Sequence, residues 1–268
     1  MAQLWSDAAG PPDAPVVVLV HGSMDRSAGL LRLSRRLDGD ARVVRYDRRG
    51  YGRSVGMEPR FDMTTQVEDL RCVVDRHAPG RSIALVFGHS YGGNVAMAFA
   101  ERHASRVGRV VVYETPLSWL DWWPGDSAGG AALGADDPGD AAEAFMRRLV
   151  GDRVWDGLPA VRRAERRAEG PAMLGELADL RRQAPWHAER VRVPVLALHG
   201  ELARPHHQRA MRYLAELVPD GRVRGVPGAG HAGPHTHPSE VADCVVDVLA
   251  TMGGDVQGSA TAQEEAGQ

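Results

Sequence analysis

The serine at position 90 has a glycine two residues before it and another two residues after it, in the segment Gly88-His89-Ser90-Tyr91-Gly92. The apolar run Ser82–Phe87 comes directly before this segment, and a helix-compatible stretch follows it. A strand that passes into a helix so abruptly needs a turn at which both flanking positions lack a side chain. Such a turn holds the hydroxyl out above the sheet edge, beside the positive end of the helix. We interpret Ser90 as a candidate nucleophile; the alternative is an ordinary glycine-rich turn.

Short apolar runs alternate with helical patterns on both sides of this turn. Continuous β-branched runs bounded by Gly and Pro are typical of strands buried on both faces of a parallel sheet. The alternation predicts right-handed crossovers, and therefore an α/β fold with a mostly parallel twisted sheet flanked by helices. The expected strands are Val16–Val20, Arg42–Tyr46, Ser82–Phe87, Gly108–Tyr113, Val193–Leu198 and Val223–Val226.

The pattern divides the chain into a core, an insertion and a tail. Residues 1–116 and 191–252 carry the strand–helix alternation. Residues 117–190 lack strand-like runs and contain a Gly/Ala/Asp-rich loop and helical stretches, which predicts a helical lid over the sheet edge. Residues 253–268 are rich in Gly, Ala, Gln, Glu and Ser, and we expect a disordered tail there.

Composition excludes several classes of partner. With 268 residues, a formal charge of −3 and a pI near 6.4, the chain has no basic field for nucleic acid. No apolar run approaches the roughly 20 residues of a membrane span. Cys72 and Cys244 are too few for a disulfide framework, and Met1–Asp7 does not resemble a signal peptide. We therefore expect a cytoplasmic protein; nothing in the sequence indicates its oligomeric state.

A serine hydroxyl is a weak nucleophile, so it needs a base beside it. His231 lies in the glycine-rich loop Gly228–Gly233, between the last expected strand and the last expected helix. Such a loop can bring an imidazole to Ser90 at the sheet edge. His235 and His237 are the alternatives, but they lie nearer to Pro238, where the final helix begins.

An acyl-transfer site also needs N–H donors for the oxyanion that develops. The amide of Tyr91, directly after the serine, supplies one from the helix N-terminus. The loop His21-Gly22-Ser23-Met24 follows the first long strand, and we expect its second donor to be the amide of Ser23, with Met24 as the alternative. We interpret His21 as an organiser of this loop.

Taken in this order, the motifs resemble those of the α/β-hydrolase superfamily over residues 14–252. They are His21-Gly22, the run Asp47–Ser54 after the second long strand, the turn at Ser90 and the late His231. The resemblance implies a small bacterial serine hydrolase with a helical lid. Such an enzyme cleaves a carboxylic ester, thioester or lactone through an acyl-enzyme intermediate. In Asp47–Ser54, Asp47 and Arg49 are expected to brace loops.

The sequence departs from the family at the triad acid. Most relatives carry an aspartate in a Gly-x-x-Asp arrangement, but this chain reads Gly200-Glu201-Leu202-Ala203. Some branches take the acid from the strand before the lid, where this chain has Glu114. We therefore assign Glu114 as the residue that orients His231. Glu201 is the alternative acid, and Glu114 could instead serve only to anchor the lid.

The sequence predicts no cofactor and no metal. The pairs His206-His207 and His235-x-His237 lack a third ligand at usable spacing, which favours surface histidines. Tryptophans concentrate in the predicted lid, and a roof of this kind suits an apolar or aromatic acyl substrate. The pocket residues that we predict are Met24, Trp119, Trp122 and Trp123. The same tryptophans could instead pack the lid onto the sheet.

Two other function classes stay open. The same triad can serve an acyltransferase, a C–C hydrolase or a lyase. The loss of the usual aspartate at Ala203 also fits a non-catalytic, ligand-binding member of the superfamily.

Overall fold

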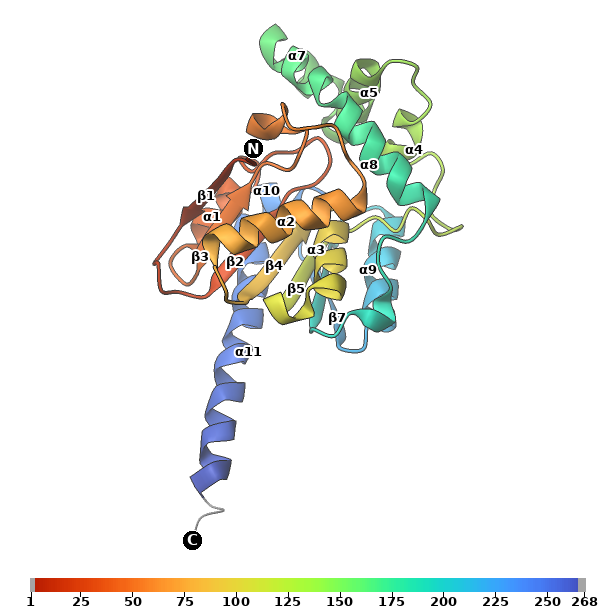
Figure 1. The fold of residues 1–268 in the computed structure, drawn as a ribbon. Helices are drawn as coiled ribbons and strands as arrows, with labels where there is room; N and C mark the ends of the chain where they lie inside the picture. The colour runs from red at the N-terminus through yellow and green to blue at the C-terminus, as the bar shows by residue number, and fades with distance from the viewer. Residues whose placement is uncertain (1–2, 265–268) are drawn as a thin grey trace.

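The computed structural model describes residues 3–264. A seven-stranded sheet runs in the order β1-β3-β2-β4-β5-β6-β7 (Figure 1). Strand β1 pairs antiparallel with β3, and every other neighbouring pair is parallel, as the alternating pattern predicted. The strands are β1 (Ser6–Ala9), β2 (Val16–Val20), β3 (Arg42–Tyr46), β4 (Ile83–His89), β5 (Val107–Tyr113), β6 (Val195–Gly200) and β7 (Gly221–Val226). The sequence did not predict β1, because its four residues, Ser-Asp-Ala-Ala, carry no apolar pattern.

Helices cover both faces of the sheet. One hydrophobic core lies between the sheet and α2, α3 and α9, and a second lies between the sheet and α1 and α11. In β2, Val16, Val18 and Val20 face the first core, whereas Val17 and Leu19 face the second. A strand with apolar residues on both sides therefore reads as a continuous run. The helices are α1 (Leu31–Leu37), α2 (Met63–His77), α3 (Tyr91–Arg102), α9 (Pro205–Leu217), α10 (Gly233–Thr236) and α11 (Pro238–Glu264).

The remaining helices fall within residues 117–190, where the sequence predicts a lid. They lie above one end of the sheet (Figure 1) and have an apolar core of their own, which includes Phe145, Trp155 and Met173. Helix α7 has no buried residue and carries four arginines and one glutamate, with Arg162 paired to Glu165, as a solvated surface helix does. The helices are α4 (Ala128–Ala132), α5 (Pro138–Val150), α6 (Asp152–Asp156), α7 (Ala160–Ala168) and α8 (Gly170–Arg182).

The C-terminal segment differs from its prediction. Where we expected a disordered tail from residue 253, helix α11 continues to Glu264. Residues 253–264 contain three glycines, which disfavour helix and explain the prediction of a tail, but they contain no proline that would end the helix begun at Pro238. Residues 265–268 of the predicted tail lie outside the described residues.

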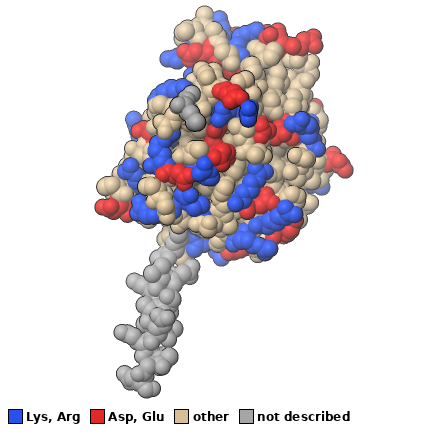
Figure 2. Space-filling model, in the orientation of Figure 1, with Lys and Arg blue, Asp and Glu red and all other residues tan. Residues whose placement is uncertain are grey.

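Basic and acidic side chains are mixed over the face drawn in Figure 2. Many are paired on the same helix, as Arg71 is with Glu68 and Asp75 on α2. Among the described residues, none of the helices has an apolar stretch of the length that crossing a membrane requires.

A buried ion pair joins the helical insertion to the sheet core. The Arg48 guanidinium lies 2.7 Å from the Glu176 carboxylate, and neither side chain is exposed. Arg48 follows β3, whereas Glu176 lies on α8, and the Tyr51 hydroxyl donates to the same carboxylate. Arg48 also donates to the carbonyl oxygens of His21 and Gly22, at 2.9 and 3.1 Å. Arg48 therefore connects the His21–Met24 loop to Glu176 on α8 of the insertion.

We expect Glu176→Gln to lower the free energy of unfolding by about 3–5 kcal/mol, because it leaves a buried guanidinium without a counter-charge. Urea denaturation followed by circular dichroism measures this loss. Glu58 pairs with Arg60 at an exposed site, so the control Glu58→Gln should cost less than about 1 kcal/mol. A loss below about 1 kcal/mol in Glu176→Gln would contradict a stabilising role of the Arg48–Glu176 pair.

Candidate active site

The turn at Ser90 joins β4 to α3 with one residue between them. Ser90 has φ of +52°, in the left-handed region that disfavours side chains. A Cβ on Gly92 would lie 2.3 Å from the carbonyl oxygen of Val20, and one on Gly88 would lie 2.4 Å from that of Gly92. Both glycines are therefore required by steric contact. The strain and the packing fix the direction in which the Ser90 side chain leaves the sheet.

Glu114 and His231 meet at the end of β5. Glu114 follows the last residue of that strand, has φ of +47° and is fully buried. Its Oε2 lies 2.7 Å from Nδ1 of His231, and its Oε1 accepts the amide of Gly200 at 2.9 Å. A carboxylate only accepts, so Nδ1 of His231 carries the proton and Nε2 keeps its lone pair. The imidazole is thereby held in the tautomer that a general base requires.

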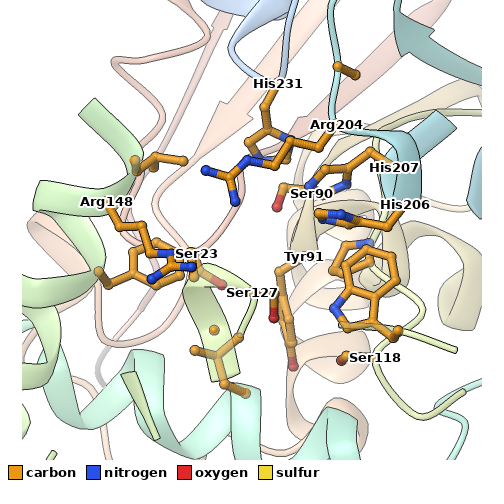
Figure 3. A pocket seen from close by; sticks show the side chains of 18 of the residues that line it. Ser23, Ser90, Tyr91, Ser118, Ser127, Arg148, Arg204, His206, His207 and His231 are labelled. Atoms are coloured by element: carbon orange, nitrogen blue, oxygen red, sulfur yellow. The ribbon is translucent and has the colours of Figure 1, made fainter. Parts of the chain in front are cut away.

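Ser90 and His231 line the same cavity, which has a volume of about 290 Å³ (Figure 3). Within residues 3–264, no direct hydrogen bond joins the Ser90 hydroxyl to His231. In free enzymes such bonds are often long and shorten when substrate binds. The structure therefore brings the candidate nucleophile, base and orienting acid to one site.

The predicted oxyanion donors lie on either side of the serine. Tyr91 is the first residue of α3, so its amide has no acceptor within the helix. Ser23 lines the cavity, and the preceding Gly22 packs so closely that a Cβ there would lie 3.0 Å from Cβ of Ser90. Nε2 of His21 accepts the amide of Arg48 at 2.9 Å. His21 thus organises this loop, and burial, helped by Arg48, lowers its pKa to about 4.

Of the four pocket residues predicted, only Trp123 is among those that line this cavity. Met24 is buried in the core of the helical insertion. Trp119 packs edge-on against Trp186, and Trp122 packs against Tyr213. These two tryptophans therefore fix the segment after β5 to the body of the protein, which was the alternative considered for them.

The alternative acid and bases lie elsewhere. Glu201 is exposed at the surface, and its amide bonds to the carbonyl oxygen of Val226 at 3.1 Å. His237 is 2.8 Å from the Thr236 hydroxyl, and His235 faces Asp25 at 3.3 Å. Ala203, where the usual aspartate is missing, lines the cavity. The structure thus places Glu114, and not Glu201, against His231.

His207 was not among the predicted site residues, but it stacks on His231 with ring centroids 4.6 Å apart. Burial, followed by the charge on His231, lowers the pKa of His207 well below its usual range. His207 therefore stays neutral and supports one face of the His231 ring. A signal was present: His207 lies in the first turn of α9, directly after β6, at the edge where the parallel strands end.

Three arginines that the sequence did not predict also line the cavity, Arg148, Arg181 and Arg204. Arg148 and Arg204 are labelled in Figure 3 among the side chains around the cavity. Among the described residues that line it, none is Asp or Glu. The cavity therefore combines apolar walls, such as Phe145 and Leu177, with a positive rim.

The chain is similar in sequence to known hydrolases. The sequence model of the protein family described as "Alpha/beta hydrolase family" matches residues 17–244. The pimeloyl-[acyl-carrier protein] methyl ester esterase of Aromatoleum aromaticum is 30% identical over 190 residues, which are 62% of this chain and 74% of that protein. The carboxylesterase YbfK of Bacillus subtilis is 28% identical over 239 residues, covering 84% of this chain and 76% of that protein.

Solved structures share the fold at lower identity. An esterase from Thermogutta terrifontis superposes with a TM-score of 0.72 at 20% identity, covering 92% of this chain and 93% of that one. The enol-lactonase from Burkholderia xenovorans superposes with a TM-score of 0.68 at 23% identity, covering 92% and 96%. At these identities the likeness concerns the arrangement of strands and helices.

Proposed function

Because this chain belongs to the alpha/beta hydrolase family, we propose that it is a serine hydrolase that cleaves carboxylic esters, thioesters or lactones. The observation that supports this most is the 2.7 Å contact between Glu114 and Nδ1 of His231, beside the strained turn of Ser90. The esterases among its relatives support the same class of reaction.

In the first half of the reaction, Nε2 of His231 takes the proton of the Ser90 hydroxyl as the oxygen attacks the substrate carbonyl. Glu114 stays ionised and stabilises the imidazolium through Nδ1–H. The amides of Tyr91 and Ser23 bind the oxyanion. Collapse of the tetrahedral intermediate breaks the bond to the leaving group, which takes the proton from His231. The acyl group remains on Ser90.

In the second half, water attacks the acyl-enzyme and His231 takes one of its protons. The new intermediate releases the acid, and the proton returns to the Ser90 oxygen. His207 stays neutral beside His231 because burial lowers its pKa, so the site develops one imidazolium rather than two. Two adjacent positive rings would oppose each half of the reaction.

The substrate that we propose has an apolar or aromatic acyl group of modest size together with an anionic group. Trp123, Phe145 and Leu177 line the cavity and suit the apolar part. Arg181 and Arg204 suit a carboxylate or a similar anion, since no acidic residue among those described lines the cavity, whereas Arg148 already lies 3.9 Å from the Asp126 carboxylate.

Arg204→Gln should lower kcat/KM for the monoester of an aromatic dicarboxylic acid by about tenfold or more, because it removes a charge-assisted hydrogen bond. Hydrolysis of the neutral diester should change little. Initial rates with the two substrates measure the difference. Arg209 lies over the ring of Trp122 and does not line the cavity, so Arg209→Gln is the matched control. An equal loss for both substrates would contradict recognition of the anion.

Hydrolysis in H₂¹⁸O tests the reaction class. With p-nitrophenyl esters and acyl thioesters, the acid released should contain one ¹⁸O atom from the solvent. Transfer of the acyl group to an added alcohol or amine in preference to water would instead identify an acyltransferase. A protein that turns over none of these substrates and does not react with a fluorophosphonate would be a ligand-binding member of the family.

A further inference from the structure

Three side chains that the proposed mechanism does not use meet next to the segment that carries Ser90. Asp25 lies in the loop after β2, His89 is the last residue of β4, and His235 lies in α10. One ligand atom from each lies within 4.8 Å of the other two. None of the three residues is among those that line the cavity. The cluster is therefore separate from the substrate site.

The atoms that meet here are buried and unsatisfied. Asp25 Oδ2, His89 Nδ1 and His235 Nε2 have no hydrogen-bond partner among the described residues. Asp25 Oδ2 and His235 Nε2 are 3.3 Å apart, an ion-pair distance, but they are not aligned as a hydrogen bond. Buried polar atoms are normally satisfied. Here the ion pair partly satisfies Asp25 and His235, whereas His89 Nδ1 faces them with no partner, and a ligand shared among the three atoms would satisfy all of them.

A hydrogen bond at Nε2 of His89, the ring nitrogen that faces away from the cluster, sets the tautomer of this side chain. Nε2 of His89 lies 2.9 Å from the backbone carbonyl oxygen of His231. A carbonyl oxygen only accepts, so Nε2 carries the proton of the neutral ring and Nδ1 keeps a lone pair. That lone pair faces the cluster from a side chain that is 94% buried, since His89 is 6% exposed. A histidine that binds a metal through one nitrogen commonly donates the other N–H to a carbonyl in this way.

We propose that Asp25, His89 and His235 form a binding site for a divalent transition metal such as Zn²⁺. Two imidazole nitrogens and one carboxylate oxygen are ligands that Zn²⁺ accepts, with water in the fourth position. Ligand atoms around a tetrahedral Zn²⁺ with bonds of about 2.0–2.1 Å lie about 3.3 Å apart. Asp25 and His235 already have this separation, 3.3 Å. The distances from the His89 ligand atom to those of Asp25 and His235 are at most 4.8 Å, and they must shorten when the metal binds.

The position of the site assigns it a structural role. Asp25 is two residues after Ser23, His89 directly precedes Ser90, and His89 holds the carbonyl of His231. A metal ion here joins the three segments that carry the oxyanion donor, the nucleophile and the base. It contacts none of the reacting atoms, because its ligands lie outside the cavity. No local spacing reveals this site, since its ligands lie at positions 25, 89 and 235 of the chain.

Calorimetric titration of the chelator-treated full-length protein with Zn²⁺ tests the proposal. We expect one equivalent to bind per chain and to raise the melting temperature by about 5–10 °C at a hundredfold excess over Kd. Asp25→Asn and His235→Gln should each weaken binding at least tenfold. His237→Gln is the matched control and should bind normally, because His237 is half-buried, as His235 is, but lies outside the cluster.

A second cluster, Glu114, His207 and His231, also has ligand atoms within 4.8 Å of one another, so the titration must separate the two. His207→Gln should leave the proposed equivalent intact. Loss of binding in His207→Gln but not in His235→Gln would overturn the proposal and place the metal at the catalytic histidine. Absence of binding to the wild-type protein would overturn it as well. Because the titration does not use turnover, its failure is distinct from failure of the proposed hydrolase activity.

Discussion

Ser90→Ala should lower kcat for ester hydrolysis by about four to six orders of magnitude, to the level set by the oxyanion donors and binding alone. This substitution removes only the hydroxyl group. Among the described residues, that group makes no hydrogen bond that holds the fold. Alanine is no more strained than serine at φ of +52°. Steady-state rates with a p-nitrophenyl ester, together with a melting curve, measure the two effects separately.

Ser118 provides the matched control, since it lines the same cavity without adjoining the turn. Ser118→Ala should retain kcat within a few-fold. Turnover by Ser90→Ala at more than about one per cent of the wild-type rate would place the nucleophile on another residue. A large loss in Ser118→Ala with little loss in Ser90→Ala would identify that residue.

Glu114→Gln should lower kcat by about three to four orders of magnitude while the fold stays intact. Oε1 of Glu114 accepts the amide of Gly200 at 2.9 Å, so the amide oxygen of glutamine keeps that position. Its NH₂ group then faces Nδ1 of His231 and donates to it. The proton of the imidazole moves to Nε2, and the lone pair that should accept the Ser90 proton is lost. The variant therefore changes the tautomer more than the packing.

Glu201→Gln is the control for this change, because Glu201 is the other carboxylate that the sequence offered. It is exposed and should change kcat less than twofold. If Glu201→Gln were the damaging change and Glu114→Gln the neutral one, Glu114 would only anchor the chain between β5 and β6. Pre-steady-state rates of acyl-enzyme formation would show which half of the reaction is affected.

The parts of the structure that the sequence predicted depend on short-range patterns. The run Val16–Val20 is apolar throughout because its residues alternate between two cores, and this identifies a buried parallel strand. Gly88 and Gly92 are required because a Cβ at either position would contact backbone at less than 2.5 Å. Glu114 could be chosen over Glu201 because it directly follows a strand at the edge where catalytic groups gather.

The parts that it missed depend on contacts between distant segments. His207 could be assigned to a surface helix until the structure stacked it on His231. Trp119 and Trp122 could face either the cavity or the protein body, and only the packing of Trp186 and Tyr213 decides between them. The cluster of Asp25, His89 and His235 spans almost the whole chain, so no local spacing reveals it.

Labelling with a fluorophosphonate, followed by peptide mass spectrometry, tests most directly whether His231 and Glu114 activate the Ser90 hydroxyl. We predict one adduct per chain, on the peptide that contains Ser90. The adduct should be absent in Ser90→Ala and His231→Ala and should form at least a hundredfold more slowly in Glu114→Gln. An adduct on another residue, or equal labelling rates in the wild-type protein and His231→Ala, would contradict this assignment.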